Sequence, residues 1–246
     1  MEIQVAVAKV GKYATRESGD TVEMIERPHG GFSFVLVDGQ RSGRSAKAIS
    51  NLVARKAVTL LGEGVRDGAV ARAAHDYLYT YRGGKVQATL NIMSVDLVSR
   101  TIVMSRNSHC PTFVITAEGL RVLDEPSRPL GVHRGTKPLV VELPLVESTT
   151  IILFTDGLLA AGQRQGESLD LPALVQGLCD GCACDARFVA DQLLAEALRL
   201  DKERASDDIS ILVLGVHARR ERDEPAALSN ADVRRLSLTV PLGGGY

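Results

Sequence analysis

Short apolar segments at the start of the chain have the period of β-strands. Strands are predicted at residues 2–10 and 21–27, and a nearly uninterrupted apolar run follows at residues 32–37. Because this run is short and is followed by Asp38-Gly39, it is typical of a strand that is buried on both faces. The beginning of the chain is therefore predicted to be β-structure.

The period then changes to that of amphipathic helices. A first helix is predicted after Gly43, and a second from about residue 67 to residue 81, with Asp67 as its N-cap and Gly83-Gly84 after its end. The apolar face of the first helix carries Ala46, Ile49, Val53, Ala57 and Leu60. The apolar stripe of the second carries Val70, Ala73, Ala74, Tyr77, Leu78 and Tyr81.

Strict alternation of apolar and polar residues returns at residues 86–92. Further strands are predicted at about 101–106, 111–117, 138–146 and 149–154, with short turns between several of them. Consecutive strands joined by tight turns favour antiparallel pairing.

Two more helices, at about residues 169–178 and 185–200, precede a last strand at 209–216. The order of strands, two helices, strands, two helices and a strand differs from the alternation of strand and helix that builds a parallel sheet. It predicts a layered α+β fold, with helices outside and antiparallel sheets inside.

Residues 217–246 differ from the rest of the chain. The segment from His217 to Glu224 is nearly all charged, Leu236–Val240 could pair as an edge strand, and the glycine-rich end is expected to be mobile. We therefore expect one domain at residues 1–216 and a charged, partly mobile C-terminal extension at residues 217–246.

Composition and charge narrow the classes of function. The 246 residues are 45% hydrophobic and carry a formal net charge of -1, so no basic field indicates nucleic acid. No uncharged apolar window approaches the ~20 residues of a membrane span, and no basic segment followed by an apolar run suggests a signal peptide. The sequence predicts a cytoplasmic protein with no nucleic-acid or membrane partner.

Three of the four cysteines are clustered, at Cys179, Cys182 and Cys184. A structural zinc site usually needs four ligands, and no fourth cysteine or histidine lies nearby in the sequence. The cluster is interpreted as a loop with reduced thiols.

Acidic residues lie where predicted strands begin or end. Asp38 and Asp156 follow apolar strands, Asp207 and Asp208 precede the last strand, and Asp20 precedes an early one. Because strand ends are held rigidly, such carboxylates can be brought together at one sheet edge. Oxygen ligands suit Mg²⁺ or Mn²⁺, and two such ions about 3.5–4 Å apart can clamp a phosphate. Asp-Gly is also a common turn signal, so a generic α/β binding domain whose Asp-Gly pairs are only turns stays an alternative.

Seven short segments occur in one order along residues 3–216: Ser18-Gly19-Asp20, Val37–Ala46, Ala88-Thr89-Leu90, Asn107–Pro111, Pro129–Val132, Phe154–Gly157 and Ser206–Ser210. Together they resemble the motifs of the metal-dependent protein phosphatases of the protein phosphatase 2C type, in their SpoIIE-like branch. The resemblance implies a four-layer αββα sandwich, in which two antiparallel sheets are flanked by helix pairs. It also implies a protein serine/threonine phosphatase that acts on phosphoserine or phosphothreonine.

The resemblance assigns roles to individual residues. It implies two divalent metal ions, Mn²⁺ or Mg²⁺, with Asp38 bridging them and the Gly39 carbonyl binding one of them. Asp156 and Asp207 would bind the other ion, and Asp20 would hold the second ion directly or through water. A water activated by the two ions would then attack the phosphorus atom.

The chain also departs from the family pattern. Gln40 and Arg41 stand where relatives usually have a small or histidine-containing pair, so the general acid is not identified. Arg41 or Arg44 could clamp the phosphate, although solvated arginines at a helix start are the simpler interpretation. Asp208 is expected beside the metal ligands rather than among them, and His109 is interpreted as a structural turn residue.

A catalytic domain with no preceding sensor domain resembles the stressosome feedback phosphatases of the RsbX type. This resemblance implies phosphorylated STAS-domain stressosome proteins as substrates. The unusual residues after Asp38-Gly39 leave a second hypothesis, a pseudophosphatase that binds phosphoproteins without turnover. Retention of Asp38, Asp156 and Asp207 argues against such a decayed site.

Overall fold

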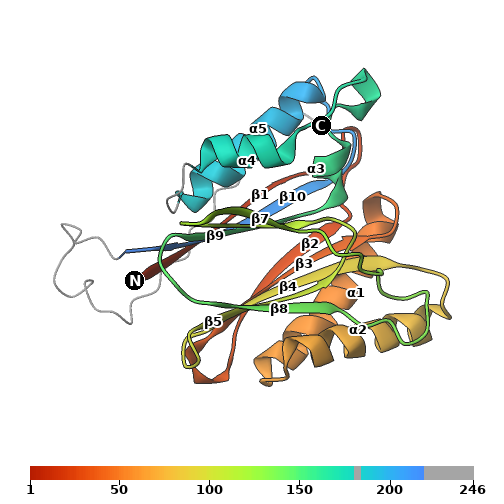
Figure 1. Cartoon of the computed structure of the whole chain (residues 1–246). Helices are drawn as coiled ribbons and strands as arrows, with labels where there is room; N and C mark the ends of the chain where they lie inside the picture. The colour runs from red at the N-terminus through yellow and green to blue at the C-terminus, as the bar shows by residue number, and fades with distance from the viewer. Residues whose placement is uncertain (180–183, 219–246) are drawn as a thin grey trace, which may run out of the picture.

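Two five-stranded antiparallel sheets lie face to face in the computed structural model, which describes residues 1–179 and 184–218 (Figure 1). The first sheet has the order β1 (Glu2–Val10), β10 (Ile209–His217), β9 (Thr149–Phe154), β6 (Thr112–Thr116) and β7 (Gly119–Leu123). The second has the order β2 (Asp20–Glu26), β3 (Phe32–Gly39), β4 (Ala88–Asp96), β5 (Thr101–Asn107) and β8 (Leu139–Pro144). The first and last strands of the domain therefore pair with each other.

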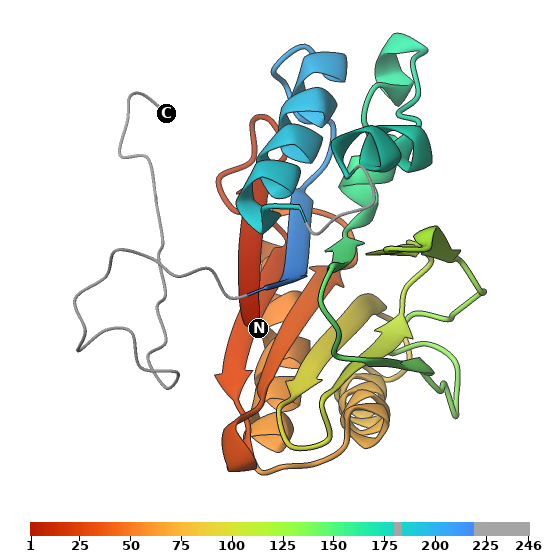
Figure 2. The same cartoon turned by 60° about the vertical axis from the view of Figure 1, so that its left-hand side comes forward.

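A pair of helices covers the outer face of each sheet (Figures 1 and 2). The long helices α1 (Gly43–Gly62) and α2 (Asp67–Arg82) pack on the second sheet, while α4 (Leu171–Leu178) and α5 (Ala186–Leu200) pack on the first. The short helix α3 (Asp156–Ala160) follows β9, and two 3-10 turns, η1 (Pro28–Gly30) and η2 (Gln163–Gln165), complete the described elements. The predicted four-layer αββα architecture is confirmed.

Three apolar layers hold this arrangement together. Leu36, Met93 and Leu212 are completely buried between the two sheets. Successive side chains of a strand point to opposite faces, so the neighbouring Val37 and Ile92 instead join the layer beneath α1 and α2. The run at residues 32–37 is apolar because both of its faces are covered, as the sequence predicts.

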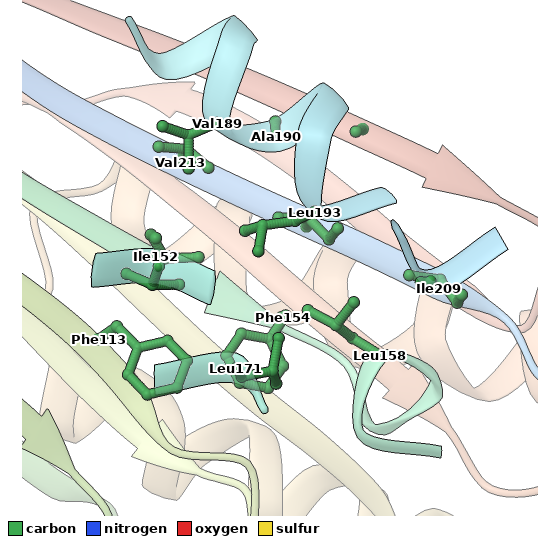
Figure 3. Packing of buried hydrophobic residues seen from close by; sticks show 14 of the residues in the cluster. Phe113, Ile152, Phe154, Leu158, Leu171, Val189, Ala190, Leu193, Ile209 and Val213 are labelled. Atoms are coloured by element: carbon green, nitrogen blue, oxygen red, sulfur yellow. The ribbon is translucent and has the colours of Figure 1, made fainter. Parts of the chain in front are cut away.

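The third layer lies between the first sheet and helices α4 and α5 (Figure 3). Phe113 and Phe154 stand on neighbouring strands, with ring centroids 5.6 Å apart. Val189 and Leu193, four residues apart on α5, are buried against this sheet. Spacing of this kind places side chains on one helical face. The burial of these two side chains holds α5 on the sheet.

The helix faces are partly corrected by the structure. Tyr77 and Tyr81 were predicted in the buried stripe of α2 but are 41% and 59% exposed, with their rings stacked on each other at the surface. In α1 the buried position is Leu61 rather than Leu60. Asp67 is the first residue of α2 and the N-cap is Arg66, while the Asp67 carboxylate accepts hydrogen bonds from Arg27 and Ser94.

The strand pattern was predicted more closely than the helix faces. Strands β1, β3, β5, β9 and β10 lie within one or two residues of the expected ranges. The short strand β7 and the helix α3 were not predicted, and β4 continues beyond the alternating segment to Asp96. Gly83 ends α2 in the left-handed conformation, with φ 59°, as its position after the apolar stripe indicates.

Some sequence predictions lie at the limits of the described residues. Within residues 1–179 and 184–218, no helix is long and apolar enough to cross a membrane. Cys179 and Cys184 are buried, and the Cys184 thiol donates a hydrogen bond to the Leu178 carbonyl. Cys182, the edge strand expected at 236–240 and the rest of the C-terminal extension lie outside the described residues.

Candidate metal centre

Five aspartates from both sheets meet at one end of the sandwich. Asp20 begins β2 and is paired in register with Asp38 on β3. Asp156 begins α3 directly after β9, and Asp207 and Asp208 precede β10, the strand paired with β9. All four of the other carboxylates lie close enough to Asp38 to act on its charge. The structure thus brings together every acidic residue that the strand-end pattern singled out.

Asp38 lies at the electrostatic centre of this group. Burial, followed by the negative charges of Asp20, Asp156, Asp207 and Asp208, raises the pKa of the Asp38 carboxyl to about 9. Positive charge nearby would stabilise the ionised form of a carboxylate that is surrounded by four like charges. A bound cation would therefore relieve the repulsion within this group.

Asp20 is the most deeply buried member, with 1% of its surface exposed. Its Oδ2 accepts hydrogen bonds from the hydroxyls of Thr155 (2.8 Å) and Ser210 (2.7 Å), whereas its Oδ1 has no hydrogen-bond partner in the described part of the chain. Burial raises the pKa of Asp20 to about 6, although the two hydroxyls pull it down. One oxygen of this carboxylate is fixed and the other is available to a ligand.

Two lysines converge on the main chain at the same place. Lys9 Nζ and Lys47 Nζ donate to the carbonyl oxygen of Asp20 at 2.6 Å and 2.7 Å. Burial, and then the charge of Lys47, lower the pKa of Lys9. These ammonium groups hold the start of β2 and add positive charge behind the aspartates.

Asp208 connects the loop after β1 to the start of β10. Its two carboxylate oxygens accept the backbone N–H groups of Lys12 (2.9 Å) and Gly19 (2.8 Å). The Lys12 ammonium lies 3.6 Å from the carboxylate of the neighbouring Asp207. Because both oxygens of Asp208 are engaged with the main chain, its place in the structure is to position the loop beside the centre.

Asp156 and Asp207 form the open rim of the group, with side chains 42% and 41% exposed. His109 Nε2 lies 3.7 Å from Asp156 Oδ2, and its imidazole is 58% exposed. Burial raises the pKa of Asp156, while the neighbouring His109 opposes this rise. The residue interpreted from sequence as a structural turn histidine therefore stands directly beside a predicted ligand.

The glycines that follow two of the aspartates are required by close backbone packing. A Cβ atom on Gly39 would lie 2.1 Å from the carbonyl oxygen of Ala46, and one on Gly157 would lie 2.1 Å from the carbonyl oxygen of Asp208. Only glycine allows two backbones to approach so closely. The Asp-Gly pairs thus lock α1 and β10 against the centre.

The unusual residues after Gly39 make the connection to β4. The backbone N–H of Gln40 donates to the Gln87 carbonyl, and the Gln40 side-chain oxygen accepts the Gln87 N–H, both at 3.2 Å. Arg41 has a left-handed backbone, with φ 76°, and both Arg41 and Arg44 are exposed. Gln40 thus connects the segment after β3 to the residue before β4, while the two arginines lie exposed near the start of α1.

The donor set fits a hard divalent cation. All of the gathered side chains are carboxylates, which Mg²⁺ and Mn²⁺ prefer, and Asp20 Oδ1 is buried without a partner in the described residues. Across residues 1–179 and 184–218, no three His, Cys, Asp or Glu side chains already form a compact ligand group. The carboxylates are thus near one another, but their oxygens do not yet converge on one common ligand position.

The family of the chain follows from a match over residues 28–217 to the sequence model of Stage II sporulation protein E (SpoIIE). This segment is more than half of the 246 residues, so the chain belongs to the SpoIIE family. No curated protein matches the chain.

Solved structures share the fold at low sequence identity. The PP2C phosphatase domain of SpoIIE from Bacillus subtilis, with a fragment of its regulatory domain, is 21% identical with a TM-score of 0.75, covering 88% of this chain and 64% of that chain. The catalytic domain of the serine/threonine phosphatase PstP in complex with two manganese ions is 14% identical (TM-score 0.67; 88% and 99%). A structure described as "The bacterial stressosome: a modular system that has been adapted to control secondary messenger signaling" is 15% identical (TM-score 0.62; 87% and 100%). The fold is that of PP2C-type phosphatase domains, and the chain spans less than two thirds of the first of these structures.

Sequence reasoning missed the residues that support the carboxylates. Thr155 and Ser210 were noted only as parts of motifs, and their hydroxyls prove to hold Asp20. Lys9 and Lys47 gave no signal, because a single lysine in a strand or a helix is normally a solvated residue. The position of Thr155 directly before Asp156 was the available indication for one of the two hydroxyls.

Proposed function

We propose that this chain is a metal-dependent protein phosphatase that hydrolyses phosphoserine or phosphothreonine on a regulatory protein. The observation that carries the proposal is the gathering of five aspartates around Asp38, whose pKa is raised to about 9 by burial and by the other four carboxylates. Membership of the SpoIIE family and the PP2C-type fold support the same reaction.

Two divalent ions, Mn²⁺ or Mg²⁺, would be held by Asp38 between them, with Asp156, Asp207, Asp20 and the Gly39 carbonyl as the remaining protein ligands. Bound ions of this kind lower the pKa of water and neutralise charge on a transferred phosphoryl group. The two manganese ions of the PstP complex support this number of ions.

The protein contributes position and charge to the reaction. Thr155 and Ser210 orient Asp20, so its unpartnered oxygen faces a ligand without rotating away. Asp156 and Asp207 are half exposed and lie where a phosphoprotein can reach them. Such preorganised charge is the main protein contribution in phosphoryl transfer.

The substrate is proposed to be a phosphorylated STAS-domain protein of a stressosome in the cytoplasm. Similarity to a structure described in connection with the bacterial stressosome supports this substrate class. It is testable directly by following loss of phosphate from a purified phosphorylated STAS-domain protein.

The decisive experiment measures hydrolysis of p-nitrophenyl phosphate with Mn²⁺, with Mg²⁺ and with a chelator. We expect metal-dependent turnover that Asp38→Asn and Asp156→Asn each reduce by at least roughly 100-fold, because each removes charge that would hold an ion. Folding of both variants is checked by circular dichroism. Turnover that survives chelation and both substitutions would falsify the metal-phosphatase proposal.

A pseudophosphatase is the second candidate, and Gln40 is the observation that favours it, since this side chain is engaged with Gln87 and offers no acid. This candidate predicts binding of Mn²⁺ and of the phosphoprotein with no turnover on either substrate. The same assay, combined with calorimetric titration of Mn²⁺, separates the two.

A further inference from the structure

A hollow of about 530 Å³ lies next to the carboxylate centre and plays no part in the proposed reaction. Its walls come from three loops: the one after β1, the one containing η2, and the one between α5 and β10. The two whole-chain views show the first of these loops beside the last (Figures 1 and 2). The lining residues are Tyr13, Arg164, Gln165, Asp201, Lys202 and Arg204.

The charge of this hollow is opposite to that of the catalytic centre. Arg164, Lys202 and Arg204 supply three positive charges, and all three side chains are exposed. The one acidic lining residue, Asp201, is buried, and its carboxylate accepts the backbone N–H groups of Gly162 and Ser206. The Asp201 carboxylate is thus bound to the main chain inside the protein, and the charged side chains at the open face of the hollow are basic.

Two of the three basic side chains are held in place by contacts within the protein. The Arg204 guanidinium stacks over the Tyr13 ring at 5.1 Å, and Arg164 donates to the Ser206 carbonyl at 3.1 Å. Lys202 has a left-handed backbone, with φ 54°. A non-glycine residue in this region costs energy, so the loop is kept in this shape by its buried Asp201.

The walls of the hollow adjoin the aspartate centre. Tyr13 follows Lys12, which lies 3.6 Å from Asp207, and the Tyr13 N–H donates to the Ala205 carbonyl. Arg164 contacts the main chain of Ser206, the residue before Asp207. A substrate chain that runs from the rim aspartates toward Tyr13 and Arg164 would therefore reach the basic hollow.

We propose that this basic hollow binds an acidic segment of the phosphoprotein substrate and so selects phosphorylation sites flanked by Asp or Glu. The inference rests on the proposed phosphatase function and names the sequence context that this site prefers. Carboxylates of the substrate pair with Lys202, Arg204 and Arg164, which offsets the repulsion between an acidic substrate and the aspartates of the centre.

Basic residues after a helix are often present only to complement the negative end of the helix dipole. That role accounts for a cation near the end of α5, but it does not require Arg164, which belongs to η2. It also does not account for the stacking of Arg204 on Tyr13, a residue of a third loop. Three loops supplying one concave basic surface favour a binding role.

The test compares phosphothreonine peptides that differ only in flanking residues: two Glu before the phosphothreonine, two Glu after it, or Gln in the same places. We expect the wild-type protein with Mn²⁺ to have a higher kcat/KM for one Glu peptide than for its Gln counterpart, by roughly three- to tenfold, through KM. The preference should shrink as salt is raised from roughly 0.05 to roughly 0.5 M, since these charges are exposed.

The Lys202→Gln/Arg204→Gln variant should lose most of this preference, measured as the ratio of peptide to p-nitrophenyl phosphate kcat/KM. Charge reversal by Arg204→Glu should shift the preference toward a Lys-flanked peptide. The matched control is Arg187→Gln/Arg199→Gln, which removes two positive charges from exposed ion pairs on α5. This control should keep the preference of the wild type.

Fluorescence anisotropy of the labelled peptides provides a readout that does not need turnover. Equal affinity and equal kcat/KM for Glu and Gln peptides, with p-nitrophenyl phosphate still hydrolysed, would overturn this inference and leave the phosphatase function intact. Preferential binding of the Glu peptide without hydrolysis of any substrate would support binding of acidic segments in the hollow and would contradict the proposed phosphatase function. Loss of preference in the Arg187/Arg199 control would show a general charge effect and would also overturn the inference.

Discussion

At the scale of single residues, Asp20 shows how a buried carboxylate can be kept ready for a ligand. Thr155 serves two groups, because its hydroxyl donates to Asp20 Oδ2 and accepts the N–H of Ser210. The Ser210 hydroxyl donates to the same carboxylate oxygen. These contacts use one oxygen fully and leave the other without a partner in the described residues.

The substitution Thr155→Val tests this arrangement. It keeps the shape of the side chain but leaves a buried N–H and a buried carboxylate each short of one partner, which costs roughly 1–3 kcal/mol of unfolding free energy. Since the hydroxyl also lowers the pKa of Asp20, its loss should raise the Mn²⁺ concentration needed for half-maximal turnover. Urea unfolding and Mn²⁺ titration of activity measure the two effects.

The control for this prediction is Thr59→Val. Thr59 lies on the exposed side of α1, and its hydroxyl donates to the Arg55 carbonyl within the same helix. Its replacement should change stability by less than about 0.5 kcal/mol. Equal behaviour of the two variants would show that Thr155 does not support the centre.

At the scale of elements, the centre depends on how closely α3 approaches the start of β10. Gly157→Ala would place a Cβ 2.1 Å from the backbone oxygen of Asp208, so one of the two segments must move. We expect a loss of roughly 1–3 kcal/mol of unfolding free energy and a large loss of turnover, because Asp156 and Asp207 would be moved apart.

Gly177→Ala is the matched control for that change. Gly177 lies within α4, and a Cβ there meets nothing within 4 Å. Alanine is the better helix former by roughly 0.5–1 kcal/mol, so this variant should be more stable than the wild type and equally active. A Gly157→Ala protein with wild-type stability and turnover would contradict the proposed packing.

The elements themselves could largely be predicted from sequence because their periods are clear. The buried strand β3 and the last strand β10 are apolar on both faces, and no helical pattern competes with them. The strand β7 could not be predicted, since its residues are mostly exposed and carry little apolar alternation. Helix α3 begins at Asp156 within a segment that has the composition of a turn.

The same limit applies to the site. The five aspartates could be predicted because they lie at the ends of predicted strands. Their contacts with loops distant in the sequence could not be predicted. Asp208 accepts N–H groups from Lys12 and Gly19, residues that are distant in sequence. The apolar pattern of α2 likewise did not reveal that Tyr77 is 41% exposed, with the Lys56 ammonium of α1 5.7 Å from the centre of its ring.

At the scale of the whole molecule, the centre opposes the folding of the metal-free protein. The pKa of Asp38 is about 9 in the folded state, well above its ordinary value of 3.8, and that of Asp20 is about 6. A carboxyl whose pKa is raised by folding favours the folded state fully below its ordinary pKa. This contribution is lost as the pH rises toward the folded value, because the unfolded chain gives up the proton first.

The stability of the metal-free protein should therefore fall as the pH rises from about 5 to about 8. In the Asp38→Asn variant this fall should be smaller, because the side chain with the most strongly raised pKa no longer ionises. Mn²⁺ at roughly 100 times its Kd should restore about 2.7 kcal/mol to the wild type at pH 8, and much less to the variant. Thermal unfolding with chelator measures the stability of the metal-free protein, and thermal unfolding with Mn²⁺ measures the stabilisation by the metal.

Two results would show that like charge does not accumulate at this end of the sandwich. One is a metal-free Tm that rises between these pH values, and the other is an Asp38→Asn protein whose Tm changes with pH as much as that of the wild type. The molecule as a whole would then have no electrostatic reason to bind a divalent ion there.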